Sequence, residues 1–449
     1  MKRERLRLSG LFAVSALAAC TIVVDPDPGA GLGESCDRDE QCQASSCIDG
    51  LCAVRCGDSG GCPGGTVCAE GICHLPLAVA YVFPFDLTQD QIGRSLDEGR
   101  IEADARLGYV ESTSDVGAAL PGDALQVATD RVNEGAGVVV STSALHADVF
   151  AAFAAETPDV TVLSYQGKPG SENLVAFDAR TYQAYYLAGV AAGKYTTSRR
   201  IGILGSIVSP AIVANINAFA LGAKSVEGAS PITIELRWIG EPHDTQPKVD
   251  GHPREWHFTR AMVADNGCDV VAHTLDNSVP LYAIADLATE GMTAYAIGAN
   301  LQDACSAAPA GRCLGSTFFR WGPLLSSVLD QIHRFEDLPP VVLGGIAVSN
   351  ETSPIGFDVP ADLSGGVSLA NDLEALRAAL AVEAGVGPIF DGPITSTGQC
   401  EEALGTSPCV AEGARLSDEG LASMCWLVQG IVDNAGVPAR VPAEDGCAN

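Results

Sequence analysis

From residue 77 to about residue 347, short apolar runs alternate with longer stretches whose apolar positions recur every three or four residues. The short runs predict strands and the longer stretches predict amphipathic helices. Near-continuous apolar strands separated by helices indicate parallel sheets that are covered on both faces. The expected strands are Leu77–Phe83, Gly137–Thr142, Val160–Tyr165, Arg200–Leu204, Ile232–Trp238, Asp269–Thr274, Thr293–Gly298, Leu314–Phe318 and Val341–Ala347. The expected helices are Gln89–Leu107, Ala124–Glu134, Arg180–Tyr195, Pro210–Val226, Glu255–Asn266, Val279–Glu290 and Gly322–Arg334.

The fold class that this pattern predicts is α/β. So many strand–helix units exceed one ordinary sheet, and either two doubly wound lobes or one barrel would accommodate them. In open α/β sheets, ligands bind at the carboxyl ends of the strands. Polar side chains follow the expected strands at Ser141, Thr142, Ser143, Asp178, His273, Thr274, Asp276, Asn277 and Asn300.

The sequence offers little for catalysis. It has no Gly-x-x-x-x-Gly-Lys-Ser/Thr phosphate loop and no Gly-x-Gly-x-x-Gly dinucleotide motif. No nucleophile and base can be paired into a hydrolase site. We therefore expect no enzymatic activity, no cofactor and no bound metal.

The N-terminus is typical of an exported chain. Residues 1–19 have a basic start and then a short apolar run, which is the pattern of a signal peptide. Leu17-Ala18-Ala19-Cys20 resembles a bacterial lipobox, so Cys20 is the expected lipidation site and residues 20–35 the expected linker. The alternative is a plain signal peptide with an incidental cysteine. The expected location is the cell envelope, anchored by lipid to a bacterial membrane and facing the periplasm or the exterior.

Eight of the 16 cysteines fall in two similar copies within residues 36–74. A module of this size cannot bury enough apolar area to fold alone, so disulfides are the expected support. Zinc is the competing interpretation, but the close Cys-x2-Cys pair that zinc usually requires is missing. The module is either a spacer or a surface that binds a partner. The cysteines are Cys36, Cys42, Cys47 and Cys52 in the first copy, and Cys56, Cys62, Cys68 and Cys73 in the second.

Three further cysteine pairs bracket short segments of the main domain. They are Cys305 with Cys313, Cys400 with Cys409, and Cys425 with Cys447, and each is an expected disulfide. This leaves Cys268 as a free thiol next to a buried strand.

The formal net charge is -30, with 56 acidic and 26 basic residues. Because 47% of the residues are hydrophobic and the acidic ones are scattered, the charge describes an acidic surface on a folded protein. Phosphate backbones would be repelled, so nucleic acid is excluded as a partner.

Several sequence blocks occur in a familiar order. Phe177-Asp178-Ala179-Arg180 precedes a run of aromatic and small residues from Tyr182 to Lys194. Further blocks are Asn215–Ala223, Gly267–Thr274, Tyr295–Gly298, Arg320–Pro323, Phe390–Ile394 and Leu416–Trp426. Together they resemble the basic membrane protein (BMP) family. Its members are substrate-binding lipoproteins of ABC importers, also described as purine nucleoside receptor A-like. The resemblance covers residues 77–442.

The resemblance implies a type I periplasmic-binding fold, with two Rossmann-like lobes that close on a ligand at a hinge. It implies a domain over residues 77–449, with a first lobe at about 77–178 plus 299–320. The second lobe would comprise about 179–298 plus 321–395, followed by a C-terminal closure at 396–449. The implied ligand is a small polar molecule, usually a purine nucleoside or nucleobase, which is passed to ABC permease subunits. An alternative is a surface sensory receptor of the same fold with a different ligand.

Carried over by position, the resemblance implies a pocket built from both lobes. Asp178 could instead cap a helix, His273 could be satisfied within the core, and Trp321 could be core rather than a stacking surface. The implied pocket residues are Ser141, Thr142, Ser143, Asp178, Arg180, His273, Thr274, Asp276, Asn277, Asn300, Arg320 and Trp321.

Two positions depart from the pattern of the family. Ile92 stands where the family has an aromatic residue that stacks on the base, and the second aromatic position falls near Pro242 and His243. The sequence therefore predicts a weaker grip on a flat base, unless His243, Phe85 or Trp321 substitutes.

Overall fold

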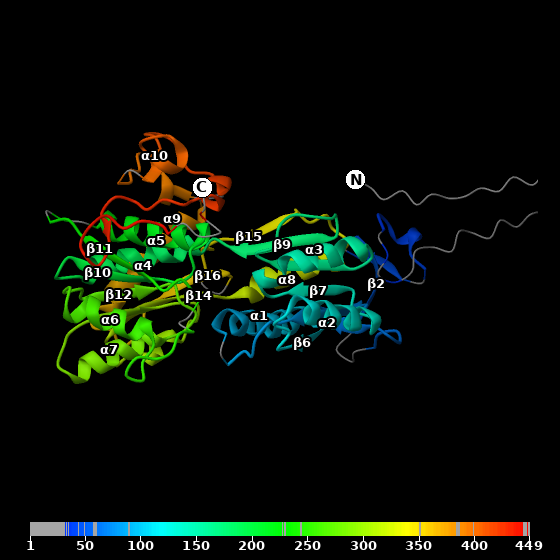
Figure 1. The fold of residues 1–449 in the computed structure, drawn as a ribbon. Helices are drawn as coiled ribbons and strands as arrows, with labels where there is room; N and C mark the ends of the chain where they lie inside the picture. Colours follow the sequence, from blue (N-terminus) through cyan, green and yellow to red (C-terminus); the bar gives the residue numbers. More distant parts are fainter. Residues whose placement is uncertain are drawn as a thin grey trace, which may run out of the picture.

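The computed structural model describes residues 32, 34 and 36–447, except 44, 49, 57–60, 89, 227, 229, 243–244, 350–351, 383–386, 398 and 443–446. Two α/β lobes lie side by side, and a small module adjoins the far end of one of them (Figure 1). Within these ranges, no helix has the length and apolar character needed to span a membrane. The expected signal peptide and Cys20 lie outside the described residues.

The first lobe is a six-stranded parallel sheet in the order β15-β9-β8-β7-β5-β6. Helices α2 and α3 cover one face, and α1 packs with α8 on the other. The strands are β5 (Leu77–Val82), β6 (Val110–Asp115), β7 (Val138–Ser141), β8 (Thr161–Tyr165), β9 (Leu174–Ala179) and β15 (Val341–Gly344). The helices are α1 (Gln91–Leu107), α2 (Pro121–Asn133), α3 (Ala147–Glu156) and α8 (Trp321–His333).

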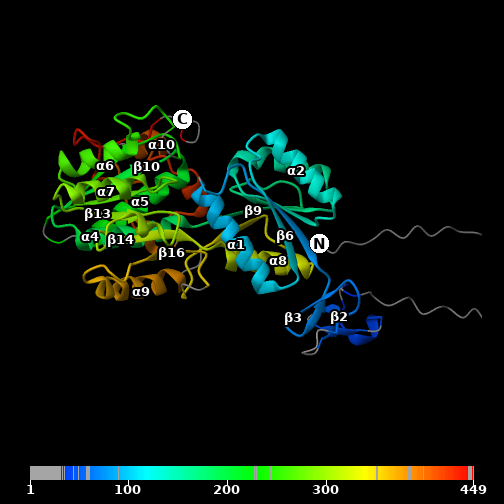
Figure 2. The ribbon, with the colours of Figure 1, turned by 90° about the horizontal axis from the view of Figure 1, so that it is seen from below.

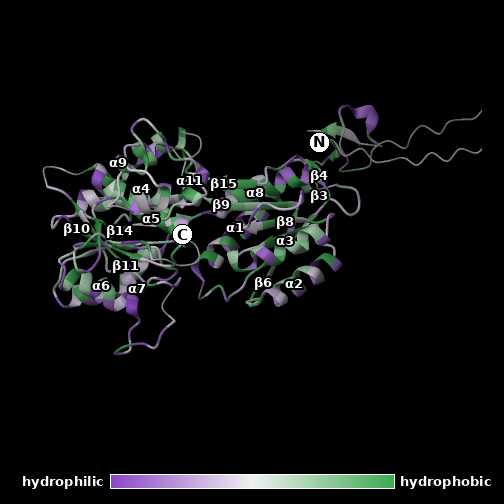
Figure 3. Cartoon of the chain, turned by 45° about the horizontal axis from the view of Figure 1, so that its top comes forward, coloured by the Kyte–Doolittle hydropathy of each residue, from purple (hydrophilic) through white to green (hydrophobic). Residues whose placement is uncertain are grey.

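The second lobe is a seven-stranded sheet in the order β16-β14-β13-β12-β10-β11-β17, in which only β16 is antiparallel to its neighbour. Its inner strands around β10 and β14 are hydrophobic, shown in green in Figure 3. The strands are β10 (Arg200–Gly205), β11 (Thr233–Trp238), β12 (Val270–His273), β13 (Tyr295–Gly298), β14 (Cys313–Phe319), β16 (Ile355–Asp358) and β17 (Ile431–Val432). The helices are α4 (Thr181–Tyr195), α5 (Pro210–Ser225), α6 (Arg254–Ala264), α7 (Val279–Thr289), α9 (Gly366–Val382), α10 (Gln399–Leu404) and α11 (Asp418–Ala422).

Three crossovers join the lobes, and they correct the expected division. Residues 299–320 were expected in the first lobe, but β14 pairs with β13 and β16 in the second. Residues 321–395 were expected in the second lobe, but α8 packs on α1 and β15 pairs with β9 in the first. The chain therefore crosses after β9, β14 and β15.

The segment that resembles the family signature forms α4, which packs closely against α5. A side chain at Gly189 would overlap the carbonyl oxygen of Phe219, and one at Gly222 would overlap that of Tyr186. Both glycines are therefore required because the two helix backbones nearly touch. This close packing fixes α4, which starts directly after the first crossover.

Residues 36–74 form a small antiparallel module with the strand order β1-β2-β4-β3. Four disulfides support it: Cys36–Cys47, Cys42–Cys52, Cys56–Cys68 and Cys62–Cys73. The three expected disulfides of the main domain are confirmed, and Cys268 is a buried free thiol. The strands are β1 (Ser46–Ile48), β2 (Leu51–Arg55), β3 (Val67–Ala69) and β4 (Ile72–His74).

Candidate functional site

The carboxyl ends of strands in both sheets face the boundary between the lobes. All three crossovers leave carboxyl ends, namely those of β9, β14 and β15. The backbone N–H of Arg180 donates to the carbonyl of Gly344 (2.7 Å), and that of Arg320 donates to Pro354 (2.8 Å). The crossovers are therefore linked to one another beside the edge where ligands bind in open α/β sheets.

The amino end of α1 touches the second lobe (Figure 2). Asp90 caps this helix by accepting from the backbone N–H of Gly93 at 2.8 Å. The N–H of Ile92 donates to Asp276 Oδ1 (3.2 Å), and Gln91 Nε2 donates to Ser278 Oγ (3.1 Å). The first turn of α1 is thus a polar contact between the lobes.

Two carboxyl groups from opposite lobes meet at this contact. Asp276, in the loop after β12, is hydrogen-bonded to Asp90. Burial, together with the negative charge of Asp90, raises the pKa of Asp276 to about 8. Asn300 Nδ2 donates to Asp276 Oδ1 at 3.3 Å. At neutral pH the Asp90–Asp276 pair therefore holds a proton.

Tyr165 and Asp178 extend this polar cluster into the first lobe. Tyr165 ends β8 and is buried, and burial together with Asp178, Asp276 and Asp90 raises the pKa of its phenol. Burial raises the pKa of Asp178 to about 6, against opposing hydrogen bonds from the N–H of Ala179 (2.7 Å) and from Gln166. Three acidic side chains thus lie close enough to one phenol to shift its pKa.

His273 offers a buried donor at the end of β12. Its Nδ1 accepts from the N–H of Leu275 at 3.3 Å, while Nε2 finds no hydrogen-bond partner among the described residues. Burial lowers the pKa of the imidazole to about 4, so the ring is neutral and carries its proton on Nε2. The N–H of Ser206 donates to the Thr274 hydroxyl (2.8 Å), which supports the adjoining loop.

The expected trio after β7 serves its own loop. Thr142 Oγ1 donates to the carbonyl of Val82 at 2.7 Å. Ser143 Oγ accepts from the N–H of Leu145 at 3.2 Å, and Ser141 is fully buried. These hydroxyls hold the strand end in place.

Three other expected pocket residues form hydrogen bonds or ion pairs with residues outside the polar cluster. Arg180 forms an ion pair with Asp418 in α11 (2.9 Å) and donates to the carbonyl of Leu343 (3.2 Å). Asn277 Nδ2 donates to Glu255 Oε1 at 2.8 Å. Arg320 Nη2 donates to Gln302 Oε1 at 3.2 Å. In this conformation they support the hinge and the second lobe.

The tryptophan expected to stack on a base lies in the core. Trp321 is fully buried, its Nε1 donates to Ser95 Oγ (3.1 Å), and it stacks on Phe319 with ring centroids 5.0 Å apart. Phe319 is half-buried at the end of β14. The sequence interpretation therefore missed Phe319 as an aromatic surface near the hinge. Phe85 is 45% exposed, and His243 lies outside the described residues.

Asp90 and Tyr165 were also missed as pocket candidates. A signal existed for Tyr165, which ends an expected strand, whereas Asp90 fell inside the expected helix Gln89–Leu107 and was not recognised as its cap. Their meeting with Asp276 depends on the approach of the lobes, which no local pattern reports.

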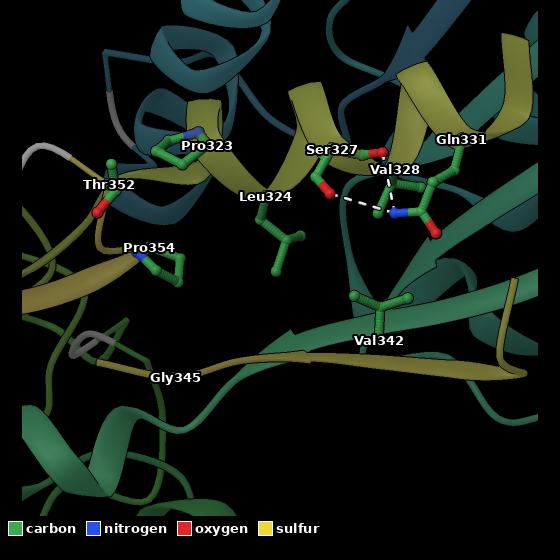
Figure 4. Close-up of a pocket in the computed structure, with 9 residues that line it drawn as sticks. All are labelled: Pro323, Leu324, Ser327, Val328, Gln331, Val342, Gly345, Thr352 and Pro354. Carbon is green, nitrogen blue, oxygen red and sulfur yellow. Dashed lines mark hydrogen bonds between the residues drawn. The ribbon is translucent and has the colours of Figure 1, made fainter. Parts of the chain in front are cut away.

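A cavity of about 220 Å³ lies elsewhere, between α8 and β15 (Figure 4). Figure 4 shows that Gln331 Nε2 donates to the carbonyl and to the hydroxyl of Ser327, both at 3.1 Å. It is smaller than typical ligand pockets and has no titratable lining residue. Because first-lobe elements and the last crossover form it, closure of the lobes would not enclose a ligand there.

Comparison with known proteins agrees with this architecture. The family model for PnrA-like ABC transporter substrate-binding proteins (Bmp) matches residues 80–339. A putative ABC transporter glucose-binding protein of Haloferax volcanii is 30% identical over 190 residues, 42% of this chain and 46% of that protein. A purine-binding protein of Brucella abortus is 25% identical over 300 residues, 66% of this chain and 75% of that protein. The chain thus spans about half the length of the Haloferax relative.

Solved structures support the fold. An ABC transporter solute-binding protein of Conexibacter woesei superposes with a TM-score of 0.53 at 19% identity, covering 68% of this chain and 96% of that one. One from Aeropyrum pernix gives 0.54 at 14% identity, with 68% and 91% covered. Since the family model spans more than half of the sequence, the chain belongs to the PnrA-like family of ABC transporter substrate-binding proteins.

Proposed function

We propose that this protein is the extracytoplasmic receptor of an ABC importer, which closes two lobes around a small polar ligand and presents it to the permease. The observation that carries the proposal is the polar cluster at the lobe boundary, to which both lobes contribute. Asp90, Tyr165 and Asp178 come from the first lobe, and His273, Asp276 and Asn300 from the second. A ligand that completes hydrogen bonds to both lobes favours the closed state.

The proposed ligand is a purine nucleoside or nucleobase. The purine-binding relative from Brucella supports this class. The carboxyl groups of Asp90, Asp178 and Asp276 can accept from base N–H groups or ribose hydroxyls, while Phe319 on Trp321 supplies a flat aromatic surface. The competing class is a sugar, which the glucose-binding relative from Haloferax supports. The loss of an aromatic residue at Ile92 weakens the purine case.

Native mass spectrometry of the protein purified without denaturation would test the ligand class directly. Calorimetry with a nucleoside and nucleobase panel and a matched hexose panel would follow. We expect binding of a purine compound, weakened at least tenfold in Tyr165→Phe or Asp178→Asn. Asp159→Asn, at an exposed position outside the cluster, is the matched control. Binding of hexoses alone would overturn the purine assignment, and failure of both panels would overturn both classes.

We further propose a chain divided into a leader (1–19), a linker (20–35), the disulfide module (36–74) and the two-lobed domain (77–449). Cys20 would carry the lipid that holds the protein at the membrane. The expected outcome of Cys20→Ser is release into the soluble fraction with loss of a metabolic palmitate label. Cys268→Ser should stay membrane-bound. A Cys20→Ser protein that still sediments with membranes would contradict the anchor.

A sensory receptor is the second candidate, because the disulfide module beside the first lobe offers a surface for a partner protein. Co-purification with permease subunits would favour the importer. Capture of a signalling protein by the liganded form, with no permease interaction, would favour the receptor.

A further inference from the structure

The contact between α1 and the loop after β12 places one carboxyl group of each lobe against the other. Asp90 belongs to the first lobe and Asp276 to the second, and a hydrogen bond joins them. Two ionised carboxylates in such a contact would repel each other, so one of them must keep its proton. When the lobes separate, water reaches both groups and both can ionise.

We propose that Asp90 and Asp276 form a proton-dependent latch, which closes the unliganded receptor when they share a proton and releases it when the proton leaves. This deepens the proposed function by naming a regulation of the same cluster. The latch rests on the proposed function only in requiring that the two lobes open and close.

Neighbouring N–H groups occupy one oxygen of each carboxyl group. Ile92 N–H and Asn300 Nδ2 both donate to Asp276 Oδ1, and Gly93 N–H donates to Asp90 Oδ1. Each carboxyl group thus has one oxygen already occupied, which leaves the remaining oxygens to share the proton.

Among the residues that the structure describes, the charged groups around this cluster do not replace that proton. The other acidic group facing the pair is Asp178, which adds negative charge, and Tyr165 keeps its phenol proton. His273 is neutral because burial lowers its pKa to about 4. The nearby cation Arg94 is already paired with Glu98 (2.9 Å) and Asp303 (3.2 Å).

The sign of the effect follows from linkage. The pKa of Asp276 is raised to about 8 in the closed form, whereas an open, hydrated Asp titrates near 3.9. The closed form therefore binds the proton more tightly. Its advantage is complete below about pH 4 and lost by about pH 8, with a tenfold fall in the closed-to-open ratio per pH unit between them.

The test follows closure without any ligand, in the purified full-length protein. Hydrogen exchange at the Ile92 amide reports the contact directly, because that N–H donates to Asp276. After correction for the intrinsic pH dependence of exchange, protection of Ile92 should fall by roughly tenfold per pH unit from pH 5 to 7.5. The radius of gyration from X-ray scattering should rise over the same range.

Asp276→Asn removes the titrating group but keeps a hydrogen-bonding side chain, so closure should lose its pH dependence. Asp90→Asn should do the same and serves if the first variant does not fold. Asp303→Asn is the matched control: it removes the Arg94 ion pair across the lobes and should keep the wild-type pH slope.

The latch is overturned if the wild-type protein shows constant Ile92 protection and radius from pH 5 to 8. It is also overturned if the Asn variants keep the wild-type slope. Because no ligand is used, these outcomes are independent of the ligand panels that test the receptor function.

Discussion

The disulfide module and the two lobes hold their chains together by different means. Within the described part of the module, the buried apolar side chains other than cysteine are few, namely Leu51, Ala53 and Ala69, and Cys52 is fully buried. In the second lobe, Phe219 is fully buried where α4 crosses α5. A short chain that cannot build a core depends on covalent links, whereas a long one relies on apolar burial.

The two regions meet at the end of the first lobe, where Ala69 of the module packs against the core of the lobe beside an aromatic cluster. His74 of β4 stacks on Tyr109 (4.5 Å between centroids), and Tyr109 stacks on His333 of α8 (4.3 Å). Tyr109 OH donates to Asp330 at 2.7 Å, and the facing nitrogens of the two histidines are 3.3 Å apart. The module therefore contacts the lobe through aromatic rings and a small apolar side chain.

The largest expected effect is loss of the core contact in the second lobe. Phe219→Ala removes a fully buried ring between α4 and α5, where the close backbones leave little room to collapse into the space. We expect the free energy of unfolding to fall by about 3–5 kcal/mol in urea denaturation. Phe335→Ala, at a side chain 75% exposed, should change it by about 0.5 kcal/mol or less. Equal losses in the two variants would contradict this account of the lobe.

Removal of a covalent link should affect the module next most strongly. The double variant Cys62→Ser, Cys73→Ser opens one of its four disulfides and should destabilise the module by about 2–3 kcal/mol. Limited proteolysis should then cut within residues 36–74 while the melting temperature of the lobes stays unchanged. In the control, Cys305→Ser with Cys313→Ser, the strands around β13 and β14 remain paired, so new cleavage should be small. Protease resistance of the opened module would argue that its apolar contacts suffice.

Acid should loosen the contact between the two regions. Burial lowers the pKa of both His74 and His333, so the docked form disfavours their protonation. The undocked histidines titrate near pH 6.5, so docking is complete above that pH and weakens as pH falls below it. Asp330 and Glu70 oppose this effect, and Arg334 adds to it. After correction for the intrinsic pH dependence of exchange, the protection of residues 72–77 should fall from pH 7.5 to 5, less so in His333→Gln. Protection that does not change with pH would refute the role of the histidines.

The smallest effect concerns the one free thiol of the described cysteines. Cys268 is buried 3.9 Å from Glu235, and burial raises the pKa of its thiol to about 12. In a Cys20→Ser background, iodoacetamide at pH 8 should therefore leave the native protein unmodified and add one adduct after denaturation without reductant. Rapid labelling of the native chain would show that this part of the lobe opens.

The sequence predicted most elements of the lobes within a few residues, because buried strands and amphipathic helices have distinct periodicities. Strand β6 was not predicted from the sequence, because it lies at a sheet edge and its residues, Val-Glu-Ser-Thr-Ser-Asp, are almost entirely polar. Helix α3 escaped because it is short, and β16 lies at an edge of the second sheet. Edge elements bury less apolar surface, so their pattern is weaker. The interior strand β9 and the helix α9 were also not predicted, although both bury apolar residues.

For the candidate site, the sequence placed Asp178, His273, Asp276 and Asn300 at strand ends correctly, but not the partners of the others. Arg180 and Asn277 find Asp418 and Glu255, which lie 238 and 22 positions away in the chain. Such pairings depend on how distant segments dock.

By itself, the sequence determined the α/β class, the division into a cysteine-rich module and a larger domain, and the resemblance to one family. These follow from local periodicity, cysteine spacing and short sequence blocks. Only the tertiary structure decided that β14 belongs to the second lobe and α8 to the first, that Trp321 is core, and that Asp90 meets Asp276. The reason is physical: side chains distant in sequence acquire their partners, and their shifted pKa values, only when burial brings them together.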